Sequence, residues 1–347
     1  MREKIRLVVQ NIGLPRIIII SFLLTLIFGA VVYKIPLDAL TTDTLVRFGM
    51  NGVLVLAMVP CIQSGTGLNF GLPLGIICGI LAGLISIEMN LVGFQAIFTA
   101  MLISIPLSAI SGYFYGVLLN KVKGSEMMVG NYVGFSVVSL MCIGWLVLPF
   151  KNGEIIWPIS GKGLRTTIAL TSRYDKILNE FMSFKIGGVV VPTGLILFFF
   201  MACFLMWLFM RSKTGIALKA VGDNPRFATA SGIHVDRARL IGTVLSTVIG
   251  GIGIIVYAQS FGFFQLYQAP LYMAFPPVAA ILIGGASTRN AKISHVIMGT
   301  LLFQALLTIA LPVANKLVSE GNLSEVARII VSNGIILYAL TQAGGGE

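Results

Sequence analysis

Uncharged amide side chains within long apolar runs are the residues of this sequence best suited to act on a solute. An amide can hydrogen-bond a neutral polyhydroxylated or heterocyclic molecule without carrying a charge into apolar surroundings. The same group can instead hydrogen-bond a neighbouring helix, which is its commoner use inside membranes, so both interpretations stay open. The amides concerned are Asn51, Gln63, Asn69, Gln95, Asn131, Gln259, Gln304 and Asn333.

Small residues interrupt one of these apolar runs, since 63–71 reads Gln-Ser-Gly-Thr-Gly-Leu-Asn-Phe-Gly. Glycines and small hydroxyls lower helical propensity, and non-helical backbone at membrane depth is tolerated only where protein or a water-filled cavity surrounds it. A similar break, Gly-Gly-Ala-Ser-Thr, occupies 284–288. Two such breaks in the two halves indicate a weak internal repeat of the kind found near transport pathways. We therefore expect Gln63, Asn69 and Asn131 to face a central polar cavity.

Enzymatic and metal chemistry have no signature in the sequence. The nearest string to a phosphate-binding loop, at 161–163, lacks both the required earlier glycine and the following Ser or Thr. His234 and His295 stand apart from cysteines and carboxylates, so we expect no metal ligands. No nucleophile motif and no pair of carboxylates occurs, so we expect no catalytic residue and no cofactor. The four cysteines lie in apolar runs and are expected to act in packing.

The elements that carry these residues must be membrane spans. Of the 347 residues 56% are hydrophobic and only 11% are charged, and the mean hydropathy is +0.94. Soluble domains carry about 25% charged residues, so a soluble enzyme or a secreted disulfide scaffold is excluded. The net charge of +11 is scattered between apolar runs and does not indicate a nucleic-acid partner. The composition predicts an all-α polytopic protein in contact with membrane lipid.

The apolar runs predict about ten transmembrane helices in a single domain over 1–347, some of them discontinuous. Lys and Arg crowd the short loops on the side of the two termini, which predicts that both termini are cytoplasmic. The segment 151–187 is then an external loop, with an amphipathic helix expected near 174–184, and 211–239 is a cytoplasmic loop. The expected spans are 15–35, 48–66, 70–89, 91–119, 127–150, 188–210, 240–261, 270–287, 293–314 and 325–342.

The cytoplasmic loop contains the signals of a short capped helix. Asp223 or Asn224 is suited to the N-cap and Pro225 to the first turn, and Gly232 stands where a glycine ends a helix. We expect a helix over about 225–231 that presents Arg226 and Phe227, one charged group and one aromatic anchor. On its own, this pattern is also compatible with an ordinary structured loop.

The same loop carries a family resemblance. It resembles the cytoplasmic coupling region of permease subunits of bacterial ABC importers that handle simple sugars, nucleosides, autoinducer-2 and branched-chain amino acids. The matching positions of that pattern are Gly215, Ala220, Gly222, Asn224, Ala228, Gly232, Ile233 and Val235. Thr229 replaces the second alanine of a pair. The string 279–287 is similar to a second family motif. In the first half, 65–71 stands where sugar permeases have Gly-Ile-Asp-Leu-Ser-Val-Gly, with Asn69 and Phe70 at the polar–hydrophobic pair.

The resemblance implies a division of labour among subunits. Two permease subunits, identical or paralogous, would form the pathway in the bacterial inner membrane, ABC ATPase subunits would dock on the cytoplasmic loops, and an external binding protein would deliver the solute. It implies a pathway that includes Gln63, Asn69, Phe70 and Asn131. It implies a coupling surface formed by Gly222, Asn224, Pro225, Arg226, Phe227 and Gly232. The solute would be small and polar, a simple sugar or a nucleoside.

Two other classes of protein fit the sequence less well. A stand-alone secondary transporter of a small neutral solute normally carries ionisable groups inside its spans, and the spans of this sequence have almost no acidic residues. A membrane enzyme would need a catalytic constellation, and the sequence contains none. Both interpretations are therefore weaker than a transport subunit that receives its energy from another protein.

Overall fold

The structure is a computed structural model that describes residues 14–158, 163–317 and five positions between 329 and 337. The described part is an α-helical membrane protein in which six helices are long and apolar enough to cross a bilayer. They are α3 with α4 (Leu37–Leu56 and Met58–Gln63), α6 (Gly93–Lys121), α7 (Glu126–Val147), α9 (Thr193–Arg211), α12 (Val235–Phe261) and α15 (Ile293–Leu317). Shorter apolar helices are α2 (Leu14–Val32), α5 (Pro73–Glu88) and the pair α13 and α14 (Ala269–Tyr272 and Phe275–Ile283).

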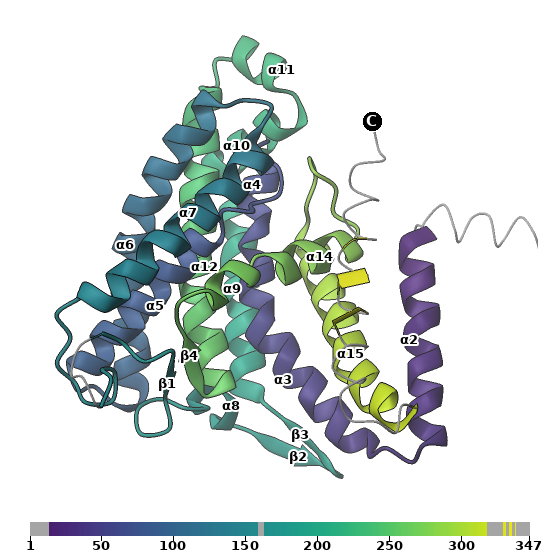
Figure 1. Ribbon diagram of the computed structural model, residues 1–347. Coiled ribbons are helices and arrows are strands. Elements are labelled where there is room, and N and C mark those ends of the chain that lie inside the picture. Colours follow the sequence, from purple (N-terminus) through teal and green to yellow (C-terminus); the bar gives the residue numbers. More distant parts are fainter. Residues whose placement is uncertain (1–13, 159–162, 318–328, 331–332, 335–336, 338–347) are drawn as a thin grey trace, which may run out of the picture.

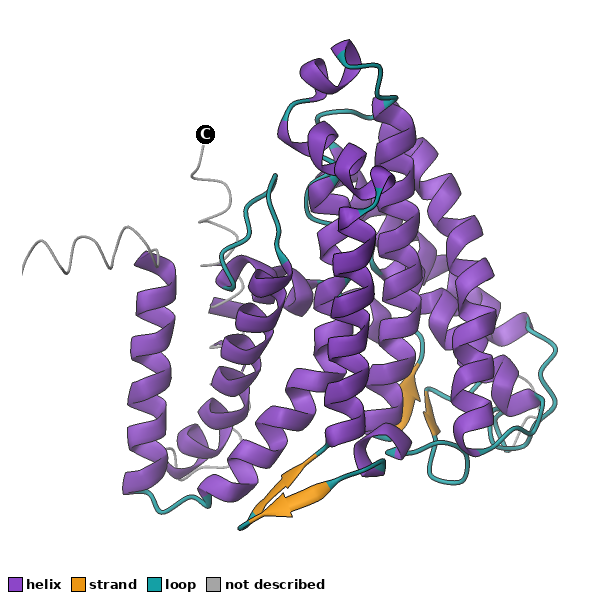
Figure 2. Cartoon of the chain, turned by 180° about the vertical axis from the view of Figure 1, so that it is seen from behind, coloured by secondary structure: helices purple, strands orange, loops and turns teal. Residues whose placement is uncertain are grey.

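The helices lie roughly side by side and share two ends (Figure 1). One end holds α10 (Lys213–Asp223) and α11 (Pro225–Ala230). The opposite end holds all four strands, which Figure 2 shows in orange. These are β1 (Thr167–Ala169), β2 (Phe184–Ile186), β3 (Val189–Val191) and β4 (Phe263–Gln265), and β1 pairs with β4 as β2 pairs with β3.

Helix α12 lies at the centre of the bundle because its small residues let neighbouring backbones approach. It packs against α6, α5 and α3. A Cβ atom added at Gly75 or Gly79 of α5 would collide with the carbonyl oxygen of Thr247 or Gly251 of α12. Without a hydrophobic force between helices in lipid, such close packing of small residues is the main source of association. The outer helices meanwhile expose large apolar side chains, including Phe28, Leu102, Phe114, Leu140 and Val147, as a lipid-facing surface requires.

The second expected span, 48–66, was wrong at its start. Helix α3 begins at Leu37 and so includes Arg47, which lies before the expected span. Asp38 in the first turn favours the helix N-terminus, and the Thr41 and Thr42 hydroxyls donate to the carbonyls of Leu37 and Asp38. With α4 the helix spans 27 residues, or about 40 Å, which exceeds the roughly 30 Å of a hydrocarbon core. Its polar first turns can therefore extend beyond the lipid.

Other expected boundaries also differ from the structure. The range 270–287 is split into α13 and α14 because Pro270 and Pro276 each lie in the first turn of a helix, where proline is tolerated, and cannot continue a preceding one. Strand β3 occupies the first residues of the expected span 188–210, and α9 begins after Pro192. The amphipathic helix expected near 174–184 is only α8 (Ile177–Glu180), because Met182 has a positive φ of 53° and β2 follows. The tenth expected span, 325–342, lies almost entirely outside the described residues.

Candidate functional site

The helix expected over about 225–231 is confirmed as α11, and its caps are formed by the predicted residues. Asn224 is the N-cap, and its Oδ1 accepts a hydrogen bond from the Phe227 N–H at 3.0 Å. At the other end Gly232 has φ +78°. The N–H groups of Gly232 and Ile233 donate to the carbonyls of Thr229 and Ala228, which is the hydrogen-bond pattern of a Schellman motif. Both ends of this short helix are thus held by its own hydrogen bonds.

The two sides of this capped loop have opposite character. Leu218, Val221 and Ala228 are fully buried and anchor α10 and α11 to the bundle. Arg226 points outward, and Phe227 is 65% exposed at the far end of the molecule from the strands. Arg226 forms no ion pair with any residue that the structure describes. An exposed aromatic ring beside an unpaired cation on a rigid helix is suited to contact with another protein.

The end of α10 touches the first of the two sequence breaks. A Cβ atom at Gly222 would collide with the carbonyl oxygen of Gln63, and a Cβ at Gly65 would lie 3.3 Å from Gly222 Cα. The backbones of the loop and of the break are therefore in direct contact. The Gln63 side chain continues the connection, because its Nε2 donates to the carbonyl oxygen of Ala291, just after the second break. Gln63 therefore connects the loop, the first break and the segment that follows the second break.

The first break is largely buried, and its polar side chains are hydrogen-bonded within the protein. Gly65 and Gly67 have φ of +74° and +79°, conformations that glycine adopts without strain. The Ser64 and Thr66 hydroxyls both donate to the Cys61 carbonyl, at 3.0 and 2.8 Å. These bonds replace the helical ones that end at Gln63. The non-helical segment is surrounded by protein, which is one of the two surroundings that such backbone tolerates at membrane depth.

Asn69 lies in this segment and is 3% exposed. Its Nδ2 donates to Ser246 Oγ of α12 at 2.8 Å, and its Oδ1 accepts from the Tyr115 hydroxyl of α6 at 3.1 Å. Ser246 in turn donates to the Ala57 carbonyl, between α3 and α4. Asn69 therefore links three helices by hydrogen bonds, the arrangement that was the alternative to a pathway role. Its place in a pathway stays a prediction.

Two of the other expected pathway residues lie around the same segment. The Phe70 ring is 6.1 Å from the Phe275 ring at the start of α14. Asn131 is partly exposed on α7, beside Gly130, whose added Cβ would meet the Tyr115 hydroxyl and the Gly71 amide. Asn69, Phe70 and Asn131 thus come together near the far end of the break, whereas Gln63 lies at its beginning.

A hollow that the sequence analysis did not identify lies on the strand side of the bundle. It measures about 320 Å³ and is lined by Asn51, Leu54, Tyr257, Gln265, Ala269, Tyr272, Met273, Pro276 and Pro277. Four elements contribute, α3, α12, β4 and the α13–α14 pair. The signals available in the sequence were the Pro276-Pro277 pair inside an expected span and the run of amides and aromatics from 263 to 268.

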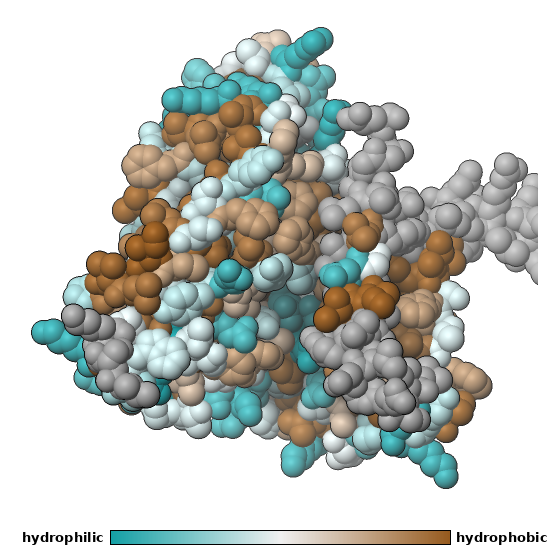
Figure 3. All heavy atoms as spheres, viewed as in Figure 1, coloured by the Kyte–Doolittle hydropathy of each residue, from teal (hydrophilic) through white to brown (hydrophobic). Residues whose placement is uncertain are grey.

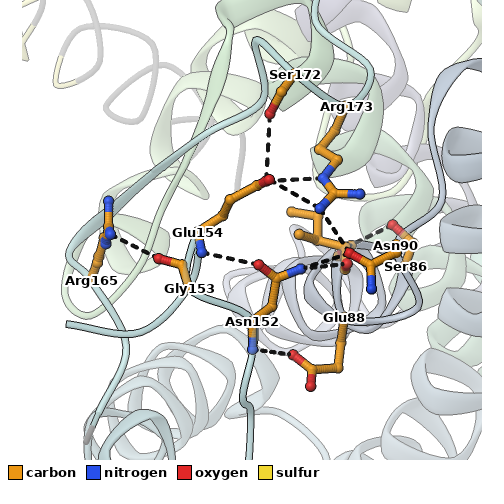
Figure 4. Close-up of polar contacts among 11 residues, drawn as sticks. Ser86, Glu88, Asn90, Asn152, Gly153, Glu154, Arg165, Ser172 and Arg173 are labelled. Carbon is orange, nitrogen blue, oxygen red and sulfur yellow. Dashed lines mark hydrogen bonds and ion pairs between the residues drawn. The ribbon is translucent and has the colours of Figure 1, made fainter. Parts of the chain in front are cut away.

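Polar contacts fasten the 151–158 segment and the loop after β1 to the end of α5 (Figure 4). The Glu88 carboxylate accepts the backbone N–H groups of Lys151 and Asn152. Arg173 donates from Nε and Nη2 to the two oxygens of Glu154, at 2.9 and 3.0 Å. These hydrogen bonds lower the pKa of the Glu154 carboxyl below its ordinary value. Among described residues, no group of three His, Cys, Asp or Glu side chains is placed to hold a metal ion.

Comparison with known proteins identifies the family of the chain. The profile described as "Branched-chain amino acid transport system / permease component" matches residues 40–340. The nucleoside ABC transporter permease protein NupB of Lactococcus lactis subsp. cremoris is 26% identical over 248 residues, 69% of this chain and 64% of that protein. The tyrosine transport system permease protein of Clostridioides difficile is 26% identical over 243 residues, 63% of this chain and 79% of that protein.

A third relative matches over more of the chain. The autoinducer 2 import system permease protein LsrD of Photorhabdus luminescens is 25% identical over 290 residues, 83% of this chain and 78% of that protein. No solved structure gave a significant match. The chain spans just under two thirds of the length of the nucleoside permease that it matches.

Proposed function

Because the chain belongs to the family of branched-chain amino acid transport system permease components, we propose that it is the membrane-spanning subunit of an ATP-driven importer. The solute is small and polar, a simple sugar or a nucleoside. The observation that carries the proposal is the match of the family profile to residues 40–340, nearly the whole helical bundle. The energy for transport comes from ABC ATPase subunits on the cytoplasmic side.

The ATPase docks on the capped loop in this proposal. Phe227 enters a cleft of the ATPase as the buried anchor and Arg226 pairs with an acidic group there, because both side chains are exposed and Arg226 has no ion pair with a described residue. Movement of α11 passes through α10 to Gly222, and from Gly222 to the backbone of Gln63 and Gly65. The junction at Gln63 then moves both breaks together, since its side chain holds the Ala291 carbonyl.

The proposed topology has ten spans, with both termini and 211–239 in the cytoplasm. The segment 151–187 faces the outside, where a binding protein delivers the solute. A second permease subunit, identical or paralogous, completes the pathway in the inner (plasma) membrane. The opposite positions of α10–α11 and of the strands support this arrangement (Figure 1).

The pathway in this proposal passes the first break. Gln63, Asn69, Phe70 and Asn131 border it, and the described conformation has the amides of Gln63 and Asn69 turned into hydrogen bonds with the protein. Release of those bonds during the transport cycle would offer the same donors and acceptors to a passing solute. The backbone of the break lies between α4 and α5 and is not part of either helix.

Reconstitution tests the proposal. The chain is purified with the ATPase and the binding protein of the proposed importer, placed in liposomes, and assayed for uptake of ribose, galactose, uridine and adenosine with and without internal ATP. We expect uptake of one of these solutes only when ATP, ATPase and binding protein are all present. Uptake by the chain alone, driven by an ion gradient, would overturn the proposal in favour of a secondary transporter.

A further inference from the structure

The hollow on the strand side combines polar groups with the apolar surroundings of the helical bundle. Its lining comes from the middle of α3, the last turns of α12, β4 and the α13–α14 pair. Figure 3, in the same view as Figure 1, shows hydrophilic surface in the recess between the helices around α12 and the group that contains α14 and α15. Hydrophobic surface lies on either side of this recess. The surrounding outer helices expose large apolar side chains. A hydrophilic recess in an apolar surface is costly unless water or a ligand occupies it.

Most polar groups of the hollow have no partner within the described chain. Asn51 uses its Nδ2 to donate to the Arg47 carbonyl at 2.9 Å, and no described residue donates to its Oδ1. The side chains of Tyr257, Gln265 and Tyr272 make no hydrogen bond with any residue that the structure describes. Within the described part of the chain, four side chains from four elements thus present unpaired donors and acceptors to one space.

One positive charge lies near this space. Arg47 is one helical turn before Asn51 on α3 and is exposed. It forms no ion pair within the described part of the chain. The lining itself contains no carboxylate. A cationic solute is therefore disfavoured, because Arg47 would repel it and no carboxylate of the lining would attract it.

From this geometry we infer that the hollow is a solute-binding site of the permease itself, for an uncharged ring-containing molecule with several hydroxyl or amide groups. The inference rests on the proposed transport function and assigns the solute a specific place. The volume of about 320 Å³ falls at the lower end of the range for small-molecule pockets, roughly 300 to 1,000 Å³. Tyrosine rings can pack against a sugar face or a heterocyclic base, and the amides can pair with the edge groups of either.

Labelling with protection by solute tests the site directly. Gln265→Cys is made after replacement of the four native cysteines, and intact cells that contain the whole transport complex react with a membrane-impermeant maleimide. Gln265 is exposed in the hollow, so we expect it to label. Separate samples receive uridine, adenosine, ribose, galactose or L-tyrosine. We expect protection by a nucleoside or a sugar, and which of the two protects identifies the solute.

Matched variants separate binding from a structural effect. Gln268→Cys, exposed three residues away but not in the lining, should label equally with and without solute. Tyr257→Phe in the labelled background should raise the half-protecting concentration about fivefold, the effect of one lost hydrogen bond. Tyr113→Phe, exposed on the outer side of α6, should leave it unchanged.

Three results would overturn the inference. The first is equal labelling of Gln265→Cys with every solute up to about 10 mM, a concentration that saturates a millimolar site. The second is protection by L-tyrosine alone. The third is an unchanged half-protecting concentration in Tyr257→Phe. Failure of the proposed function looks different, because it abolishes ATP-dependent uptake by the unmodified complex. Uptake with no protection rejects the site alone, whereas protection without ATP-dependent uptake keeps the site and rejects the importer.

Discussion

Phe227 exposes its ring at the end of a helix whose two caps hold it in place. We predict that Phe227→Ala weakens ATPase docking by about 2 kcal/mol or more, close to a thirtyfold loss of affinity, as for other aromatic anchors. Uptake should fall while solute binding by the external protein is unchanged. The measurement is ATPase retention by the purified permease in a titration.

A matched control for this prediction is Phe114→Ala. Phe114 is 69% exposed on α6, similar to Phe227, but lies among the lipid-facing residues. It should leave ATPase retention at the original level. Equal retention by Phe227→Ala and the unmodified chain would show that another surface carries the coupling.

Asn69 supplies the second prediction at the residue scale. Asn69→Leu leaves the Ser246 and Tyr115 hydroxyls without their amide partner, at a cost of about 1 to 3 kcal/mol for each group left unpaired. We predict loss of uptake with ATPase assembly retained, measured by uptake assay and co-purification. Tyr115→Phe removes only one of the two bonds and is the control for stability. If both variants melt earlier but transport at the normal rate, Asn69 serves packing alone.

At the scale of elements, the contact between α10 and the first break rests on the absence of a side chain. We predict that Gly222→Ala separates the two backbones, because the new Cβ would collide with the Gln63 carbonyl. ATP hydrolysis should continue while uptake falls severalfold, which is measured as solute moved per ATP hydrolysed. An unchanged ratio would contradict transmission through this contact.

Gly232 offers the contrasting case on the same loop, since nothing lies within 4 Å of its added Cβ but its φ is +78°. Gly232→Asn should be tolerated, because Asn adopts this conformation, whereas Gly232→Val should disrupt the helix end. At Gly222 space decides the outcome, and at Gly232 backbone conformation does.

The Glu154–Arg173 ion pair holds the segment before β1 against the loop after β1, and this contact depends on pH. Because the pKa of Glu154 is lowered in the folded chain, the pair stabilises this region fully above the ordinary carboxyl pKa. That contribution is lost as the pH falls through the lowered value. We predict faster proteolysis after 151 at acidic pH than at neutral pH. Glu154→Gln should be cleaved faster already at neutral pH and should show a smaller change with pH.

At the scale of the whole molecule, the proposed topology places the two ends of the bundle on opposite sides of the membrane. Lys185 of β2 and Arg226 of α11 are both exposed, at opposite ends. We predict that Lys185→Cys reacts with an impermeant maleimide added outside intact cells, whereas Arg226→Cys reacts only in inverted vesicles. Reaction of both from the same side would overturn the ten-span topology.

The residues that determine local structure were sufficient for several predictions from the sequence. Composition indicated an α-helical membrane protein, because apolar runs of span length have few other uses. Asn224, Pro225 and Gly232 predicted α11 and its caps, because capping depends on residues adjacent in the chain. The loop motif indicated the family, and the profile match over residues 40–340 confirms it.

Contacts between distant segments were decided only in the tertiary structure. The start of α3 at Leu37 was missed, because polar residues that are satisfied within their own helix read as a loop when only hydropathy is counted. The contact of Gly222 with Gln63, the bonds of Asn69 to Ser246 and Tyr115, and the hollow between Asn51 and Tyr257 join residues more than forty positions apart. An isolated sequence specifies which groups can hydrogen-bond, but helix packing selects the partner that each one meets and the groups that stay free for a solute.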